Sequence, residues 1–264
     1  MKNCLTLSAL LASFAALSAC GGNTVDPTAI QSGENVGNLA VSYNEVENTL
    51  TVTDGVVEYT YVQNSDGDNG AIAGFYKLQD HNDDWQDYSL RGETSSGSGE
   101  AFLVNSTENG YEAAATFLNR LETPNLPTSG TASFSGDYSG VYFGNEDEDS
   151  VWYDNITGDV TLDANFSDST VSGSITNRIS SYADAAVHDD VALSVSSISN
   201  GAFSGTASGG GGGYDNYVAS DGTYEGMFTG ADATEVIGSI NIPMTNDSYV
   251  GFEMGIFIAE EVTP

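Results

Sequence analysis

The second half of the chain alternates apolar and polar residues with a period of two. In 132–142, Phe134, Tyr138 and Tyr142 share one face, and serines and an aspartate occupy the other. This period is typical of antiparallel strands with one buried face. It recurs in about eight segments, enough to close a barrel over its own side chains. The segments are 132–142, 160–166, 171–175, 191–195, 203–207, 224–228, 236–242 and 250–258.

Within these segments a large residue is repeatedly followed, two positions later, by a glycine. Both members of such a pair lie on one face, so large and small side chains alternate inside, as small barrels require. A two-sheet sandwich is the alternative, but it would leave strand edges to protect. We therefore predict an eight-stranded antiparallel barrel. The pairs are Phe134/Gly136, Tyr138/Gly140, Val171/Gly173, Phe203/Gly205, Tyr224/Gly226 and Val236/Gly238.

The region before the barrel is rich in β signals as well, but it is less regular. Candidate strands lie at 39–43, 50–53, 56–61, 71–78 and 101–104. Residues 111–121 fit either a helix or a strand, and we favour the strand. A stretch rich in Pro, Asn, Ser and Gly, residues 124–130, marks a boundary. We therefore predict an all-β chain with a smaller β-rich domain at 39–125 and the barrel at 126–264.

The N-terminus carries signals for export. Lys2 precedes an apolar run, 4–16, that is shorter than the roughly 20 residues of a membrane-spanning helix. Leu17-Ser18-Ala19-Cys20 is similar to the lipobox of bacterial lipoproteins, in which the cysteine is acylated. We expect a signal peptide at 1–19 and a lipid on Cys20, an ordinary signal peptide being the alternative. Residues 20–38 hold few apolar residues and are predicted to form a flexible tether.

The chain is strongly acidic, with a formal net charge of −33. Such a surface repels nucleic acid, so we exclude a nucleic-acid partner. The acids are dispersed along the chain, which suits either salty surroundings or solubility alone. Cys4 leaves with the predicted signal peptide and Cys20 is expected to be acylated, so no disulfide is expected.

Residues 126–140, LPTSGTASFSGDYSG, resemble the opening of the β-barrel domain of transferrin-binding protein B-like surface lipoproteins. The resemblance covers most of 126–242. The chain departs from the family's pattern at 255–261, GIFIAEE, where members commonly end in a basic residue. It also has room for one lobe, whereas the larger transferrin-capturing members have two. The resemblance continues in order through 163–166, 171–175, 200–207, 222–228 and 233–238.

This resemblance implies a barrel preceded by a smaller β "handle", displayed on the outer surface of Gram-negative bacteria. Gly21, rather than Asp, follows Cys20, which by resemblance to known lipoproteins also indicates the outer membrane. We therefore expect a surface lipoprotein that binds haem, an iron carrier or another protein without catalysis. Its partners would include the membrane, through the lipid, and an outer-membrane receptor or translocator. A structural or adhesion lipoprotein without a small-molecule ligand is the alternative, and a glycan hydrolase is a third.

The two histidines are the candidate haem ligands, because imidazole binds iron. His81 and His188 both lie in predicted loops, near Trp85 and Tyr182. Exposed loop histidines that bind nothing are the alternative interpretation for both.

Other motifs do not support a metal site, a cofactor or catalysis. Residues 64–70 are rich in Asp and Asn, like a calcium loop, but Asn69 stands at the required glycine and Phe75 at the bidentate Glu. The acidic segment 145–149 is more typical of a solvated hairpin loop. Neither a G-x-S-x-G nor an H-E-x-x-H motif occurs. The five glycines at 209–213 precede no helix, and we expect them to form a flexible loop.

Overall fold

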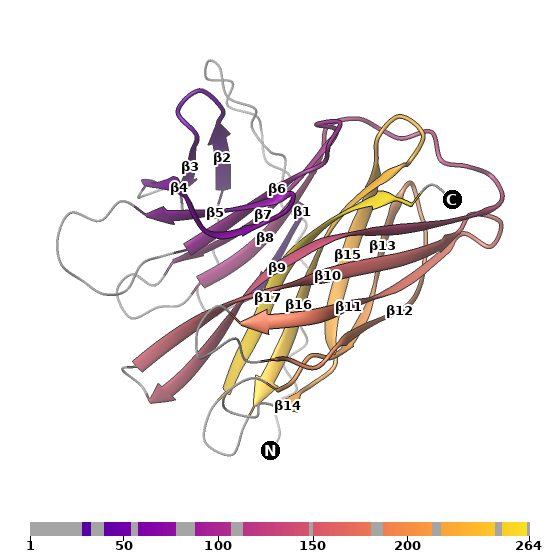
Figure 1. Cartoon of the computed structure of the whole chain (residues 1–264). Coiled ribbons are helices and arrows are strands. Elements are labelled where there is room, and N and C mark those ends of the chain that lie inside the picture. Colours follow the sequence, from indigo (N-terminus) through magenta and orange to yellow (C-terminus); the bar gives the residue numbers. More distant parts are fainter. Residues whose placement is uncertain are drawn as a thin grey trace, which may run out of the picture.

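Strands are the only regular secondary structure in the described part of the chain, and they form two antiparallel sheets (Figure 1). The computed structural model describes residues 28–32, 40–53, 58–77, 88–106, 113–147, 150–180, 187–212, 218–245 and 250–262. No helix within these ranges is long and apolar enough to span a membrane. The all-β prediction is confirmed.

The smaller sheet, which we call the handle, has the strand order β1-β8-β7-β6-β5-β4-β3-β2. The ambiguous segment at 111–121 forms a strand, β8, as the sequence favoured. Strand β1 lies inside the segment 20–38 for which we predicted a tether, and it pairs with β8, whose edge would otherwise be open. The strands are β1 (Thr28–Ser32), β2 (Ala40–Asn44), β3 (Thr49–Thr53), β4 (Glu58–Asn69), β5 (Ile72–Lys77), β6 (Tyr88–Glu93), β7 (Gly99–Ser106) and β8 (Ala113–Arg120).

The larger sheet closes into an eight-stranded barrel, because β17 pairs with β9 as well as with β16. Each alternating segment of the sequence is one of its strands, so the predicted barrel is confirmed. A two-residue strand, β14 (Val218–Ala219), pairs with the end of β16 outside the ring. The barrel strands are β9 (Thr131–Asp147), β10 (Ser150–Asn165), β11 (Thr170–Ser180), β12 (Val191–Ser197), β13 (Ala202–Gly209), β15 (Gly222–Thr229), β16 (Glu235–Thr245) and β17 (Val250–Glu261).

Aromatic rings inside the barrel lie on glycines of neighbouring strands. Phe257 and Gly238 are direct partners of the β16–β17 pair, and a Cβ at Gly238 would overlap the Phe257 ring. Phe203 covers Gly226 in the same way across the β13–β15 pair. The barrel is narrow, so a ring fits only where the opposed position has no side chain. The large–small alternation of the sequence therefore reflects packing across strands.

The apolar face that the sequence shows on 250–258 does not point into the barrel. Met254, Ile256 and Ile258 of β17 instead pack against the handle. The alternate positions face inward, and they include Glu253 and Phe257. Strand β17 is covered on both faces, by the barrel interior and by the handle, so neither face needs to be polar throughout.

The handle and the barrel share one apolar core, which we call the seam. It lies between the handle sheet and strands β9, β16 and β17, which Figure 1 shows side by side. A contiguous core of this kind contributes stability roughly in proportion to the apolar area removed from water. A separate cluster around Tyr61, Phe75 and Phe117 forms the handle's own core. The buried seam residues are Ile72, Leu90, Ala101, Leu103, Ala114, Leu118, Val141, Ile237, Met254, Ile256 and Ile258.

Polar contacts also join the handle to the barrel. Glu235, at the start of β16, is buried, and its carboxylate accepts hydrogen bonds from the handle turn between β6 and β7. The donors are the hydroxyl of Ser95 at 3.0 Å, the backbone N–H and hydroxyl of Ser96 at 2.9 and 2.5 Å, and the hydroxyl of Ser98 at 2.7 Å. Burial raises the pKa of Glu235, but the hydrogen bonds from Ser96 and Ser98 hold it below the ordinary value.

Replacing Glu235 by glutamine is expected to destabilise the protein by about 1–2 kcal/mol at pH 7, because the serine hydrogen bonds lose their charged acceptor. The folded pKa is depressed, so this contribution is present above the ordinary value of 4.5 and is lost as the pH falls through the folded pKa. Urea unfolding at pH 7 and 3.5 measures the effect. The exposed Glu260→Gln serves as the control, and an equal difference between wild type and Glu235→Gln at both pH values would contradict the assignment.

Candidate functional site

The barrel encloses a buried charged network. Arg178 of β11 and Glu253 of β17 form an ion pair with no exposed side-chain surface. The hydroxyl of Tyr138, on β9, donates a hydrogen bond of 2.5 Å to the other Glu253 oxygen. Burial and the Glu253 carboxylate raise the pKa of Tyr138 well above its ordinary value. Burial alone would lower the pKa of Arg178, but Glu253 and Tyr138 raise it. Glu253 thus pairs with both Arg178 and Tyr138, while the Nε of Arg178 has no hydrogen-bond partner among the described residues. The network acts as structural support for the barrel.

Residues 187–189 cross the barrel end beside this network. The backbone N–H of His188 donates to the carbonyl of Arg178 and that of Asp189 to the carbonyl of Gly211, each at 2.9 Å. His188 also forms an isolated antiparallel bridge with Gly212. The described part of the glycine run, 209–212, has φ near +90° at three of its glycines and packs against this end. At such positive φ values, and so close to its neighbours, only glycine fits this backbone. The flexibility that we expected of the run stays a prediction.

Of the two predicted haem ligands, His188 lies within the described residues and His81 does not. His188 is 8% exposed, so the alternative interpretation of it as an exposed loop histidine is wrong. Neither ring nitrogen has a hydrogen-bond partner among the described residues, and burial lowers the pKa of His188. Haem ligation by His188 stays a prediction and would require the 187–189 segment to open. His81 lies outside the described residues, and so does the expected lipid site, Cys20.

Part of the barrel sheet projects beyond the other strands. Strand β10 pairs with β11 only from Ile156 onward, so residues 150–155 of β10 pair with β9 alone. Residues 251–254 of β17 and 241–244 of β16 continue this sheet on the other side of β9. We call residues 141–147, 150–155, 241–245 and 250–254 the flange. In Figure 1 the β9–β10 hairpin of the flange extends past the barrel, away from the labelled C-terminus.

A row of aromatic residues crosses the flange. Tyr153 is paired directly with Phe143, Phe143 with Phe252, and Phe252 with Pro243. Directly opposed residues of antiparallel strands lie on one face of the sheet. The half-buried Phe252 packs against the edge of the seam. In the strand register, Phe143 and Phe252 thus come two residues beyond the buried Val141 and Met254, toward the end of the flange.

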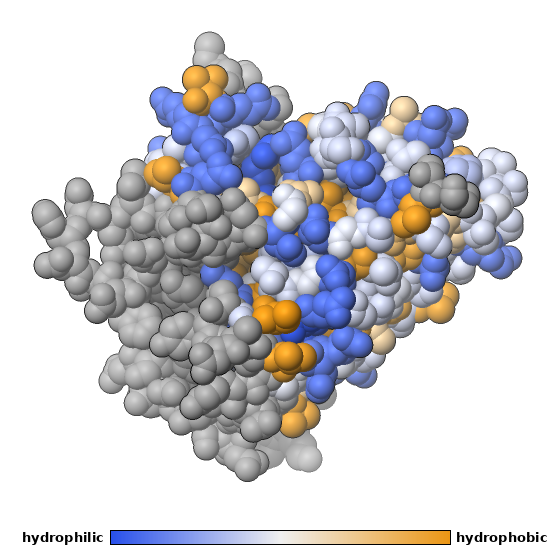
Figure 2. All heavy atoms as spheres, viewed as in Figure 1, coloured by the Kyte–Doolittle hydropathy of each residue, from blue (hydrophilic) through white to orange (hydrophobic). Residues whose placement is uncertain are grey.

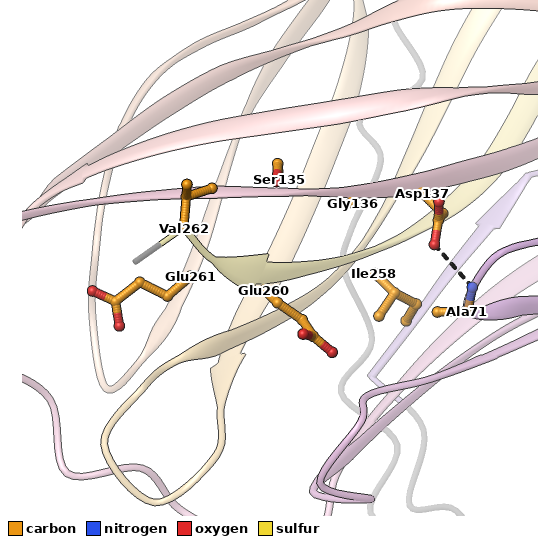
Figure 3. Close-up of a pocket in the computed structure, with 8 residues that line it drawn as sticks. All are labelled: Ala71, Ser135, Gly136, Asp137, Ile258, Glu260, Glu261 and Val262. Carbon is orange, nitrogen blue, oxygen red and sulfur yellow. Dashed lines mark hydrogen bonds between the residues drawn. The ribbon is translucent and has the colours of Figure 1, made fainter. Parts of the chain in front are cut away.

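An open groove runs beside the handle, near the start of β9 and the end of β17 (Figure 3). Its volume is about 500 Å³, and Asp137, Glu260 and Glu261 contribute carboxylates to its lining. One Asp137 oxygen accepts a hydrogen bond of 2.8 Å from the backbone N–H of Ala71 in the handle. Across the described ranges, no three or more His, Cys, Asp and Glu residues gather to hold a metal ion. The groove is thus a polar margin of the handle–barrel contact.

The described surface carries very few cationic groups. Arg91 pairs with Glu93 and Glu100 and lies over the Tyr43 ring, and Arg178 is buried. Arg120 donates to the carbonyl of Asn200 across the two sheets. On the face shown in Figure 2, hydrophilic residues dominate and apolar ones are scattered among them. A partner of this surface would meet mainly carboxylates and hydroxyls.

The family model of the C-lobe and N-lobe β-barrels of transferrin-binding protein B matches residues 126–260. The chain belongs to this family. The match covers the whole barrel except its last strand residue, Glu261. No curated protein matches the chain.

Solved structures of transferrin-binding protein B resemble this chain. Intact Ap-TbpB, with N and C lobes, has a TM-score of 0.50 at 14% identity, covering 90% of this chain and 46% of its own. The isotype 1 protein of serogroup B Neisseria meningitidis has a TM-score of 0.45 at 16% identity, and the match covers 90% of this chain and 44% of that protein. A Tyr-167-Ala and Trp-176-Ala double mutant of the protein from Haemophilus parasuis Hp5 has a TM-score of 0.48 at 14% identity, and the match covers 91% of this chain and 46% of that protein. The chain thus spans less than half the length of these proteins, and the likeness to Ap-TbpB shows the fold alone.

Proposed function

We propose that this protein is a surface lipoprotein of the outer membrane that binds a partner protein through the flange, without catalysis. Cys20 would carry the lipid, and the handle and barrel would present the flange to the partner. The observation that carries the proposal is the row Tyr153–Phe143–Phe252–Pro243 across four paired strands. Aromatic residues dominate the energetically important centres of protein interfaces.

The charge around the flange indicates the kind of partner. The hairpin that ends the flange carries four consecutive acidic residues, 146–149. A basic patch beside an apolar one would complement them. The family's name supports an iron-carrier protein as the partner class, with an outer-membrane receptor or translocator as a second partner. Haem is the second candidate ligand, because both ring nitrogens of His188 lack a partner within the described residues.

The partner class is tested with the lipid-free chain starting at residue 24 and iron-loaded transferrin as the probe. Tyr153→Ala is expected to weaken binding by roughly tenfold or more, as for an interface hot spot. Val195→Ala removes an apolar residue that is 72% exposed elsewhere on the barrel, and it should leave the affinity unchanged. Equal affinities for wild type and Tyr153→Ala would exclude the flange as the binding surface.

The absence of saturable transferrin binding would exclude that carrier, and a haemin titration would then decide between the remaining ligands. Haem capture predicts a Soret band at one haem per chain that is lost in His81→Ala or His188→Ala. The anchor is tested separately in cells. Cys20→Ala should move the protein from the membrane fraction to the soluble fraction, and retention in the membrane would contradict lipidation at this residue.

A further inference from the structure

Two glutamates at the seam have opposite surroundings. Glu235 is held by hydrogen bonds from three serines of the handle. Glu225 lies on β15, where Tyr224 points into the barrel core and Met227, two residues beyond Glu225, packs against the seam. One carboxyl oxygen of Glu225 is buried without a hydrogen-bond partner among the described residues. Both carboxyl oxygens of Glu235 thus accept hydrogen bonds, whereas one buried carboxyl oxygen of Glu225 accepts none from the described residues.

The neighbours of Glu225 supply no opposite charge. Its direct partners are Ser204 on β13 and Ser239 on β16. The described strands with the most contacts to β15 are β16, β13 and β8, and Gly99 of β7 also lies against Thr229 of β15. The charged residues of these four strands are Arg120, Glu235 and Glu100, which are engaged with Asn200, with the handle serines and with Arg91. An ionised Glu225 would therefore be partly buried with no cation facing it, which is costly.

Hydroxyl groups without partners lie near the same part of the seam. Ser239, opposite Glu225, is fully buried and its hydroxyl has no hydrogen-bond partner among the described residues. The same holds for Thr116 of β8, which stands between the seam residues Ala114 and Leu118. Buried hydroxyls without protein partners are groups that water satisfies when it gains access. This part of the seam therefore holds buried hydroxyl groups that water can satisfy when it gains access.

We propose that the seam is a pH-responsive joint governed by Glu225. The neutral side chain lets β8 close against β15, whereas the ionised side chain draws water to Ser239 and Thr116 and loosens the handle. The hydrogen bonds to Glu235 keep the handle attached in both states. The joint would thus change how firmly the handle is held without separating the two sheets.

The direction of the response follows from burial. Burial raises the pKa of Glu225 from 4.5 to about 7. A carboxyl group whose pKa is raised in the closed state favours closure at low pH, and this contribution falls as the pH rises from 4.5 through 7. If the opened state restores the ordinary value, linkage predicts that the opening equilibrium increases about tenfold between pH 6.0 and pH 8.5.

Amide hydrogen exchange in the full mature chain tests the joint. After correction for intrinsic exchange rates, amides of β8 and β15 in the wild type should lose about tenfold in protection between pH 6.0 and pH 8.5. Glu225→Gln should remain equally protected at both values, because the uncharged amide cannot ionise. Glu225→Met, a second uncharged variant of similar size, guards against an effect specific to the amide.

Glu235→Gln is the matched control. It should lower protection at both pH values and keep the same tenfold difference between them, since it weakens the handle contact without touching Glu225. The proposal is overturned if wild-type protection is independent of pH. It is also overturned if the difference persists in both Glu225 variants.

Discussion

Replacing Glu253 by glutamine alone is expected to lower the free energy of unfolding by about 3–5 kcal/mol, because it leaves a buried charge without its partner. Arg178 has no exposed side-chain surface, and the described residues that accept from its guanidinium are Glu253 and the carbonyl of Asp189. Glutamine keeps the shape of glutamate but not its charge. Urea unfolding at pH 7, followed by tyrosine and tryptophan fluorescence, measures the loss.

The matched control removes both charges at once. In Arg178→Met/Glu253→Leu no charge is left unpaired, so the double variant should lose less stability than Glu253→Gln, even though Tyr138 loses its acceptor. A double variant that is less stable than the single one would mean that the ion pair itself contributes favourably. The unpaired charge of Arg178 would then not be the cause of the large single-site effect.

Substituting alanine for Gly238 is expected to cost about 3 kcal/mol, at the upper end for overpacking a core. A methyl group at this position would overlap the Phe257 ring and approach the carbonyl of Glu225 on the neighbouring strand. Both neighbours belong to a closed barrel, so the ring has little room to move. Thermal and urea unfolding at pH 7 measure the effect.

A double-mutant cycle separates this overlap from other costs of losing glycine. Phe257→Leu shortens the opposed side chain, so Gly238→Ala should cost less in that background than in the wild type. Ser174→Ala, on the outer wall of β11, should change stability by less than about 0.5 kcal/mol. If Gly238→Ala cost the same in both backgrounds, the ring–glycine contact could not be its cause.

The fold was largely predictable because its evidence is local. Each barrel strand carries its own alternation, as in Phe134 and Tyr138 of β9 or Val236 and Ile240 of β16. The glycines that follow large residues at a distance of two positions also indicated a narrow barrel, because each such pair can be recognised within a single strand. The helix-like apolar run around Phe117 was ambiguous because its residues are buried on both faces of β8, one in the handle core and the other in the seam.

The candidate surface was not predictable in this way. Tyr153, Phe143, Phe252 and Pro243 come from four strands, and only the register between those strands puts them in one row. The sequence around His188 predicted an exposed loop residue because nothing in its neighbours shows that Arg178 and Gly211 bind its segment to the barrel end. Such contacts join residues far apart in the sequence, and no local pattern records them.

Strand β17 shows where the two kinds of information divide. By itself the sequence determined that 250–258 is a strand with an apolar face and that Glu253 lies on the other face. Only the tertiary structure decided that the apolar face meets the handle and that Glu253 lies inside the barrel with Arg178 and Tyr138. Alternation reports which residues share a face, but which face is inside depends on what covers each side, and in this protein the handle covers the outer one.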